Sequence, residues 1–373
     1  MDFTPTEEQA AARDLAARIF GDLSTHERLT AAGTGSDAGL WKELCAAGLV
    51  GAVADIGLLG LVLLLEEQGR TTAQVPFAAS CVYGLLAVAA HGSPEQRARL
   101  LPGIADGTVV VAGAISGSGP GPGMPEPEAR EPVPGRREQV SETRDSVPGR
   151  REPGPGKLTG VVPVVPWLRD ATHVLVADDR RGLWLVRVAE AAANEPVELT
   201  APWSAGRLTL DGTPGEALGA EGAHDDLLAT ARTAFAGLQA GVCAGSLARA
   251  VEHTNAREQF GRPLAAKQGV QLRAADAYMD TEAIRVTAYE AAWRRDEGLP
   301  YTSHALTAAW WASEAGQRVV HTGQHLHGGA GADLEHPVHR HFLWGRQLDA
   351  YLGCGGEVLQ ELGELIANGE VGT

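Results

Sequence analysis

The sequence has few cysteines and comparatively few positive charges. Its four cysteines, Cys45, Cys81, Cys243 and Cys354, lie far apart and form no Cys-x-x-Cys pair. This spacing argues against a disulfide framework and against a cysteine zinc site, and it fits a reducing cytoplasm. The 31 basic residues against 47 acidic ones give a net charge of −16. A non-specific nucleic-acid binder needs a basic face, so this class of protein is excluded.

The sequence also lacks a long uninterrupted apolar run. The longest one, Ile56 to Leu65, is about half as long as a membrane-spanning helix requires. The first residues, MDFTPTEEQ, are acidic and contain no apolar signal core. We therefore predict no membrane span and a cytoplasmic location.

Motifs of common catalytic classes are missing as well. The chain has no nucleophile elbow, no kinase motif set and no His-Glu-x-x-His zinc motif. The glycine-rich stretch at 117–123 runs into prolines and acidic residues rather than a helix, so it is not a dinucleotide-binding loop. His321 and His325 have the spacing of two metal ligands on one helix face. However, Pro337 and several glycines interrupt any continuous helix in that region. We therefore predict that these histidines form hydrogen bonds at an interface or near a ligand, rather than binding a metal ion.

The first hundred residues carry helix start and stop signals. Thr4-Pro5-Thr6-Glu7 combines a capping residue, a proline in the first turn and a glutamate three positions after the cap. Ser93-Pro94-Glu95-Gln96 repeats the pattern. Gly69 and Gly107 lie where helix ends favour a left-handed residue. We predict an N-terminal helical domain over residues 1–108.

The pattern changes twice after residue 108. Residues 109–222 contain short β-branched runs separated by turn residues, which predict a small antiparallel sheet or barrel. The runs are LTGVVPVV, ATHVLVAD, GLWLVRV, PVELT and AGRLTL. From residue 223 to 373, apolar residues recur every three or four positions, as they do between Leu228 and Val242 and between Leu272 and Trp293. The sequence therefore predicts an α+β protein, in which N-terminal helices are followed by a β-sheet and then by a helix bundle.

Residues 118–157 differ from their surroundings. They hold nine of the 21 prolines, no leucine, isoleucine or aromatic residue, and two copies of VPGRRE. Such a segment buries too little apolar surface to offset the entropy lost on ordering. We predict a mobile insertion in the middle domain rather than a proline-rich docking peptide.

Two C-terminal segments carry residues that helix periodicity does not explain. A turn between helices accounts for Gly261 and Pro263 but leaves Arg257, Gln259 and Phe260 unexplained. The run GGAG at 328–331 is either a helix C-cap followed by a turn or a place where backbone amides approach a phosphate-bearing ligand.

These segments resemble the two signature stretches of the acyl-CoA dehydrogenase family. They read REQFGRPLAAKQGVQ (257–271) and QHLHGGAGADLEHPVHRHF (324–342). The second has the HGGxGxxxEHxxH form typical of actinobacterial members, including those that act on steroid side-chain thioesters. The resemblance implies an N-terminal helical domain, a middle β-domain and a C-terminal four-helix bundle. It also implies FAD between the middle domain and the bundle, with a neighbouring subunit completing the site.

The resemblance assigns cofactor-binding positions. Arg257, Gln259 and Phe260 match residues that approach the adenosine diphosphate end of the flavin. The other flavin-contacting positions that match are Gln268, Gln324, Gly328 and Gly329. An arginine pairs bidentately with a diphosphate, and glycines permit close backbone approach, so these residue types suit the implied role.

The catalytic base of that family is missing. It is a glutamate that removes the α-proton of the thioester while the β-hydride passes to the flavin. Its commonest position falls here at Leu352, after Tyr351. A second placement falls at Ala231 and a third at Leu238. All three are apolar, so we assign no catalytic residue to this chain.

Other positions of the chain's own flavin site also depart from the family pattern. The position that is usually aromatic beside the flavin is Val164, and AISGSGPGPG replaces a loop of the form E-P-x-A-G-S. The sequence thus keeps the residues that it would donate to a neighbour's flavin and loses those of its own site.

We therefore predict the non-catalytic subunit of a heteromeric FAD-dependent acyl-CoA dehydrogenase, an oxidoreductase that desaturates an acyl-CoA thioester. Its partner would be a homologous catalytic subunit in a heterotetramer, or a further copy in a homo-oligomer. Two alternatives stay open. One is a self-sufficient flavoenzyme whose base is relocated to Glu357 or Asp349, and the other is a flavin-free binding or scaffold protein of the same fold.

Overall fold

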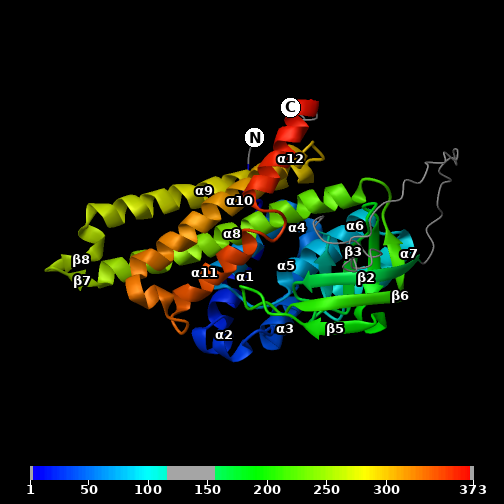
Figure 1. Cartoon of the computed structure of the whole chain (residues 1–373), viewed down its shortest axis with the longest axis horizontal. Coiled ribbons are helices and arrows are strands. Elements are labelled where there is room, and N and C mark those ends of the chain that lie inside the picture. The colour runs from blue at the N-terminus through cyan, green and yellow to red at the C-terminus, as the bar shows by residue number, and fades with distance from the viewer. Residues whose placement is uncertain (1–2, 116–155, 370–373) are drawn as a thin grey trace, which may run out of the picture.

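The computed structural model describes residues 3–115 and 156–369. Three long helices of the C-terminal part lie side by side, and a β-sheet and the N-terminal helices pack around one half of them (Figure 1). The proline-rich insertion predicted at 118–157 falls outside the described residues except for Gly156 and Lys157, which begin a strand. The predicted α+β architecture is confirmed.

The N-terminal part consists of helices with well-defined caps. Their bounds are α1 (Glu7–Leu23), α2 (His26–Ala32), α3 (Ala38–Ala46), α4 (Leu49–Thr71), α5 (Phe77–Ala79), the π-helix η1 (Ser80–Leu86), α6 (Ala87–His91) and α7 (Pro94–Ala105). The predicted cap at Ser93 is confirmed by a reciprocal capping box with Gln96. The predicted cap at Thr4 was wrong by two residues. Thr6 caps α1, because Gln9 closes the box from the third helical position.

The middle part is a mixed six-stranded sheet. Its strands are β1 (Val111–Ala114), β2 (Gly156–Val165), β3 (His173–Ala177), β4 (Leu183–Arg187), β5 (Ala193–Pro196) and β6 (Gly206–Leu218). The order is β1-β3-β4-β6-β2, with β5 paired to β6. The sheet is not purely antiparallel as predicted, because β1 pairs with β3 in parallel. Of the predicted strand PVELT, only Pro196 belongs to β5.

Alternate residues of the strands face two different cores. Val111 and Leu175 join the large core shared with the helices, whereas Ala112, Val174 and Val176 join a smaller core on the other face. This alternation follows from the two-residue period of a β-strand. The sheet is therefore anchored against the helices by one of its faces.

The C-terminal part is a helical bundle with a small hairpin. It contains α8 (Ala223–Ala256), β7 (Glu258–Gln259), β8 (Arg262–Pro263), α9 (Gln268–Asp296), α10 (Thr302–His327), α11 (Pro337–Leu348) and α12 (Gly355–Asn368). Short 3-10 turns are η2 (Val188–Glu190), η3 (Leu264–Ala266) and η4 (Gly328–Ala332). The predicted periodicity marks helix α9 correctly but not its buried face. Leu272, Met279 and Val286 are more than half exposed.

Helices α4 and α8 approach each other through glycines. Gly69 was predicted to end a helix, but it lies inside α4 and faces the carbonyl of Leu238 on α8. On α8, Gly241 faces the backbone of Glu66, and a Cβ at either glycine would overlap the opposite helix. Gly69 is therefore a residue of close helix packing, and the prediction for it was wrong because nothing local distinguishes the two roles.

The same two helices are long and apolar enough to cross a membrane by length and composition. Their best windows have a mean hydropathy of 2.2 for Leu49–Thr71 and 1.2 for Ala223–Ala256, yet 72% of each window is buried inside the structure. They are buried core helices. Asp55 interrupts the apolar residues of α4, so the longest uninterrupted apolar run covers only part of this helix.

We expect the substitution Gly241→Ala to destabilise the fold by about 1–3 kcal/mol, because the added methyl group forces α4 and α8 apart. The control is Gly363→Ala on α12, where an added Cβ meets no atom within 4 Å. The control should gain about 0.5–1 kcal/mol from helix propensity. Chemical denaturation of both variants measures the difference. Equal stability of the two variants would contradict the close packing.

Candidate functional site

The β7–β8 hairpin projects at the end of the molecule opposite the sheet (Figure 1). Gln259 pairs with Arg262, and Phe260 and Gly261 between them both have positive φ, of 57° and 76°. Glycine adopts this conformation freely, whereas a phenylalanine in it is strained by about 1–2 kcal/mol. Phe260 is nevertheless 91% exposed, with the Lys267 Nζ atom 4.8 Å from its ring centroid. A strained, exposed aromatic residue indicates a functional contact.

The polar residues of this segment are also exposed. Arg257 follows the last residue of α8, and its amide donates a hydrogen bond of 2.8 Å to the carbonyl of His253. The side chains of Arg257 and Gln259 face solvent, and Gln268 is the exposed first residue of α9. No carboxylate of the described residues forms an ion pair with Arg257. Its guanidinium is thus available for an external anion.

The second predicted segment forms a tight turn after α10. Gly328 ends the helix with a φ of 62°, and the Nε2 atom of Gln324 donates a hydrogen bond of 3.2 Å to the carbonyl of Gly331. A Cβ added at Gly328 or Gly329 would meet no atom within 4 Å. The turn therefore caps the helix and also leaves its backbone open to close approach by a ligand.

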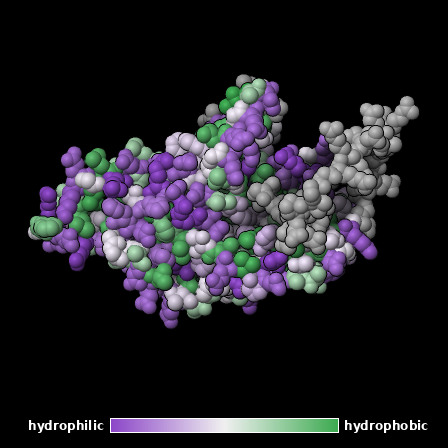
Figure 2. Space-filling model, in the orientation of Figure 1, coloured by the Kyte–Doolittle hydropathy of each residue, from purple (hydrophilic) through white to green (hydrophobic). Residues whose placement is uncertain are grey.

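The two segments lie at the same end of the molecule. The imidazole of His253 near the end of α8 stacks on that of His327 at the end of α10, with ring centroids 4.6 Å apart. The structure thus brings together all seven predicted cofactor-binding positions on one end of the bundle. Hydrophobic residues appear among polar ones on the surface of this end (Figure 2). They include Phe260 and Leu272.

The three positions that the family resemblance assigns to a base are buried in the apolar core. Leu352 is 8% exposed, and Ala231 and Leu238 are fully buried. Arg232 lies beside Leu352 and donates two hydrogen bonds, of 2.6 and 2.9 Å, to Glu361 of α12. Its Nε atom also donates to the carbonyl of Leu352 at 3.2 Å. Glu361 and Glu357, two carboxylates of α12 near Leu352, each accept a hydrogen bond that holds the start of α12 or its contact with α8.

The two carboxylates considered as a relocated base have structural contacts. Glu357 closes the capping box at the start of α12, because its Oε2 atom accepts a hydrogen bond of 3.1 Å from the amide of Cys354. Asp349 accepts a hydrogen bond of 2.6 Å from the hydroxyl of Ser313 and pairs with Arg346 at 3.1 Å. These contacts give both carboxylates a structural role at the start of α12 and the end of α11.

A cluster of aromatic residues lies between the sheet and the helices. The sequence did not predict this cluster. Its members are Tyr83 of η1, Trp167 after β2, Trp203 before β6, Phe235 of α8, Trp344 of α11 and Tyr351. Because they come from six separate segments, no local spacing reveals them. We call this set the aromatic plug.

The rings of the aromatic plug are tightly packed. Trp167 stacks on Trp203 with centroids 4.4 Å apart, and Phe235 meets Tyr351 at 4.7 Å. The hydroxyls of Tyr83 and Tyr351 share a hydrogen bond of 2.9 Å, and burial raises the pKa of both phenols. Trp167 is fully buried and has a φ of 59°, a strained conformation for a bulky residue. The backbone thus holds this indole in the plug at a cost in stability.

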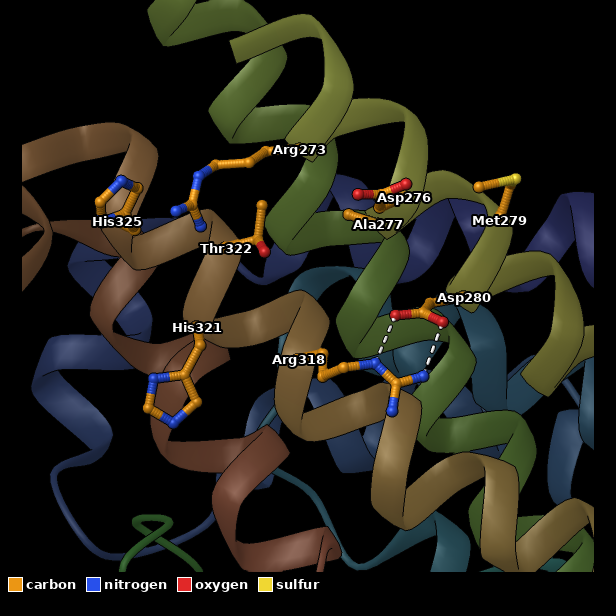
Figure 3. Close-up of a pocket in the computed structure, with 9 residues that line it drawn as sticks. All are labelled: Arg273, Asp276, Ala277, Met279, Asp280, Arg318, His321, Thr322 and His325. Atoms are coloured by element: carbon orange, nitrogen blue, oxygen red, sulfur yellow. Dashed lines mark hydrogen bonds and ion pairs between the residues drawn. The ribbon is translucent and has the colours of Figure 1, made fainter. Parts of the chain in front are cut away.

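A pocket of about 630 Å³ opens between α9 and α10 (Figure 3). Its lining comprises Arg273, Asp276, Ala277, Met279, Asp280, Arg318, His321, Thr322 and His325. Arg318 donates two hydrogen bonds to Asp280, of 2.9 and 2.7 Å. His321 and His325 do share one helix face as their spacing predicts, but the described residues contain no group of three side chains able to hold a metal ion. Most of the lining residues are charged or polar, and none of them forms a paired nucleophile and base.

Comparisons with known proteins agree with this architecture. Residues 6–108 match the model of the acyl-CoA dehydrogenase N-terminal domain, and residues 221–361 match that of its C-terminal domain. The acyl-CoA dehydrogenase FadE27 of Mycobacterium tuberculosis is 31% identical over 98% of this chain and 99% of its own length.

Two solved structures are similar over the whole fold. A variant of the steroid ACAD Tcur3481-Tcur3483 is 39% identical with a TM-score of 0.84, and the ChsE4-ChsE5 complex from Mycobacterium tuberculosis is 29% identical with a TM-score of 0.85. Each match covers 98% of this chain and 99% of the other. This chain belongs to the acyl-CoA dehydrogenase family, the oxidoreductases that act on the CH–CH bond of acyl-CoA thioesters.

Proposed function

We propose that this chain is the non-catalytic subunit of a heteromeric FAD-dependent acyl-CoA dehydrogenase. A homologous partner supplies the catalytic glutamate and most of the thioester pocket. The observation that carries this proposal is the aromatic plug, which occupies the contact between the sheet and the bundle. This is the region in which the family resemblance places the flavin of a self-sufficient subunit.

The aromatic plug lies beside the three positions at which the family resemblance places a base and this chain has an apolar residue. On α8, Ala231 and Leu238 flank Phe235 by one turn on either side, and Leu352 directly follows Tyr351. A flavin ring could enter only if several buried rings moved out. Losing the packing of one buried aromatic ring typically costs about 3–5 kcal/mol. This chain's own half of a flavin site therefore does not fit the cofactor.

The opposite end of the bundle does fit part of FAD. Arg257 has a free guanidinium, whose fork suits the two phosphates of the cofactor, and Gly328 and Gly329 leave their backbone uncovered. Gln259, Phe260, Gln268 and Gln324 lie on the same end. FAD, when bound, supplies the hydride acceptor of the reaction. The residues of this chain would bind and orient the diphosphate end of a flavin that the partner carries.

Exposed apolar residues supply a surface for the partner. Leu272, Met279 and Val286 form a stripe along α9, and Phe260 projects beyond it. Solvent-exposed apolar stripes of this kind are typical of subunit interfaces. We propose a heterotetramer in the cytoplasm that acts on a bulky, steroid-like acyl-CoA thioester. The support is the similarity to two heteromeric complexes, one of which is named a steroid ACAD.

Co-expression tests this function. Purified alone, the chain is expected to be poor in FAD, because it holds only the diphosphate end of the cofactor. Co-expressed with a homologous subunit that carries the glutamate, it should yield a yellow complex with about one flavin for each pair of unlike chains. The ratio of flavin to protein absorbance and the mass of the complex are the measurements.

Two other outcomes would overturn the proposal in different ways. A fully flavinylated homo-oligomer that turns over an acyl-CoA without a partner would establish a self-sufficient enzyme with a relocated base. A stable complex without flavin or dehydrogenase activity would instead establish a binding or scaffold role.

A further inference from the structure

Three histidines connect the two candidate cofactor-binding segments. His327, the last residue of α10, lies between His253 of α8 and His336 at the start of α11. Its ring stacks on that of His253 at 4.6 Å with an interplanar angle of 27°, and it meets the ring of His336 edge-on at 5.0 Å. We call this set the histidine stack.

One hydrogen bond of the stack requires a neutral ring, that of His336, whereas that of His327 forms with a neutral or a protonated ring. The Nδ1–H of His327 donates a hydrogen bond of 2.7 Å to the carbonyl of Gly323. The Nδ1 atom of His336 accepts a hydrogen bond of 3.2 Å from the amide of Val338 and so caps helix α11. A protonated His336 would lose this capping bond and would place a positive charge at a helix N-terminus, where the dipole disfavours it.

The surroundings also oppose protonation. Burial lowers the pKa of His327, and the positive charges of His253, His336 and Arg249 lower it further, although the Gly323 carbonyl acts in the opposite direction. Burial likewise lowers the pKa of His336, with His253, Arg249 and His26 of α2 adding to the effect. Asp333 opposes the shift of His336, and Glu252 lies close enough to interact with Arg249. Positive groups thus outnumber negative ones around the stack.

His253 and His327 are each joined through the backbone to a cofactor-binding segment. The carbonyl of His253 accepts a hydrogen bond from the amide of Arg257, so a shift of His253 moves the start of the hairpin. His327 directly precedes Gly328, whose amide donates to the carbonyl of His325. Contact between the two rings therefore fixes the distance between the hairpin and the glycine turn.

We propose that His327 is a positioning residue: clamped between His253 and His336, it holds the Arg257 hairpin and the Gly328 turn in one fixed arrangement, and acid releases both segments together. The relevance of this arrangement to a cofactor rests on the proposed function. The arrangement itself does not, because the stack lies entirely within this chain. Protonation of His336 removes its bond to the Val338 amide, and a charge on the half-buried His327 lies near Arg249, so acid weakens the contacts that hold these helix ends together.

Amide hydrogen exchange of the full-length chain tests the stack without FAD or a partner. The probes are the amides of Arg257 and Gly328, with rates corrected for the intrinsic effect of pH. In the natural protein, both are expected to exchange about tenfold faster at about pH 5 than at about pH 7.5. Burial lowers the pKa of His341 to about 4, so this neighbouring histidine stays mainly neutral over that range.

Two substitutions separate stacking from charge. His327→Ala should accelerate exchange of both amides about tenfold at either pH, because the ring that joins them is gone. His327→Phe keeps an aromatic ring that does not titrate, so exchange should become insensitive to acid. His253→Phe is the second variant, since His253 is only half-buried and its ring tolerates replacement more easily. The control is His304→Phe, at the far end of α10 beside Glu290, which should keep the natural acid response.

The proposal is overturned if the His327→Ala variant protects both amides as well as the natural protein does. It is also overturned if His327→Phe and His253→Phe retain the natural acid response, or if only one of the two amides responds. A correct exchange pattern together with a failed co-expression experiment would reject the proposed function while leaving the stack established.

Discussion

The substitution Arg257→Ala is expected to weaken the affinity of the assembled enzyme for FAD by about 10- to 100-fold. Losing a charge-assisted bidentate contact with a diphosphate costs about 1.5–3 kcal/mol. Because Arg257 faces solvent at the tip of the bundle, its removal should leave the folding stability nearly unchanged. Titration of the flavin-free complex with FAD, followed by fluorescence quenching, measures the change in affinity.

Matched variants make this result specific. Arg257→Lys keeps the positive charge but loses the planar fork, so its affinity should fall between those of the natural protein and Arg257→Ala. Arg97→Ala removes an equally exposed arginine from α7, at the sheet end of the molecule, and should leave the affinity for FAD unchanged. If Arg257→Ala binds FAD as tightly as Arg97→Ala does, the assigned cofactor role of the hairpin is wrong.

Features encoded in neighbouring residues could be predicted from the sequence. The Ser93 cap of α7 depends on a bond to Gln96, three residues away, and both appear in one short motif. The strand β4 and the helix α8 likewise follow from apolar residues at a regular spacing. The resemblance to the acyl-CoA dehydrogenases rests on two continuous segments, so the family could also be recognised before the fold was known.

Features that depend on distant residues could not be predicted. Gly69 has the sequence context of a helix end, and only the approach of Leu238 on another helix gives it its actual role. The exposed face of α9 has the same apolar spacing as a buried one, because a spacing does not tell whether the core or a partner covers it. The aromatic plug joins residues as far apart as Tyr83 and Tyr351, and the sequence offers no sign that they meet.

A missing glutamate and a closed site have different consequences for activity. An apolar residue at Leu352 is compatible with a base placed elsewhere, as long as the thioester has room to enter. Under the proposed function the plug takes up that room. Trp167 is fully buried and Trp203 is 1% exposed, and the two rings stack on each other between the sheet and the helices. A single substitution that restores the glutamate therefore distinguishes a site that lacks only its base from a site that is closed.

The substitution Leu352→Glu, which restores the family's commonest base position, is expected to destabilise the fold by about 3–5 kcal/mol at neutral pH and to create no dehydrogenase activity in the isolated chain. Leu352 lies in the apolar core, and the nearby guanidinium of Arg232 is already paired with Glu361. An ionised carboxylate there is buried without a partner, which accounts for the loss of stability.

The pH dependence of that loss identifies its cause. Burial raises the pKa of the introduced carboxyl above its unfolded value of about 4.3. The unfolded chain then releases its proton at lower pH than the folded one, so the penalty grows as pH rises above about 4.3 and becomes constant above the folded pKa. Denaturation at several pH values measures it, and Leu359→Glu, on the exposed face of α12, is the control that should show no such trend. A Leu352→Glu chain that is as stable as the control and oxidises an acyl-CoA thioester would demonstrate an open site beside Tyr351, and the aromatic plug would then have to be a displaceable part of a working active site.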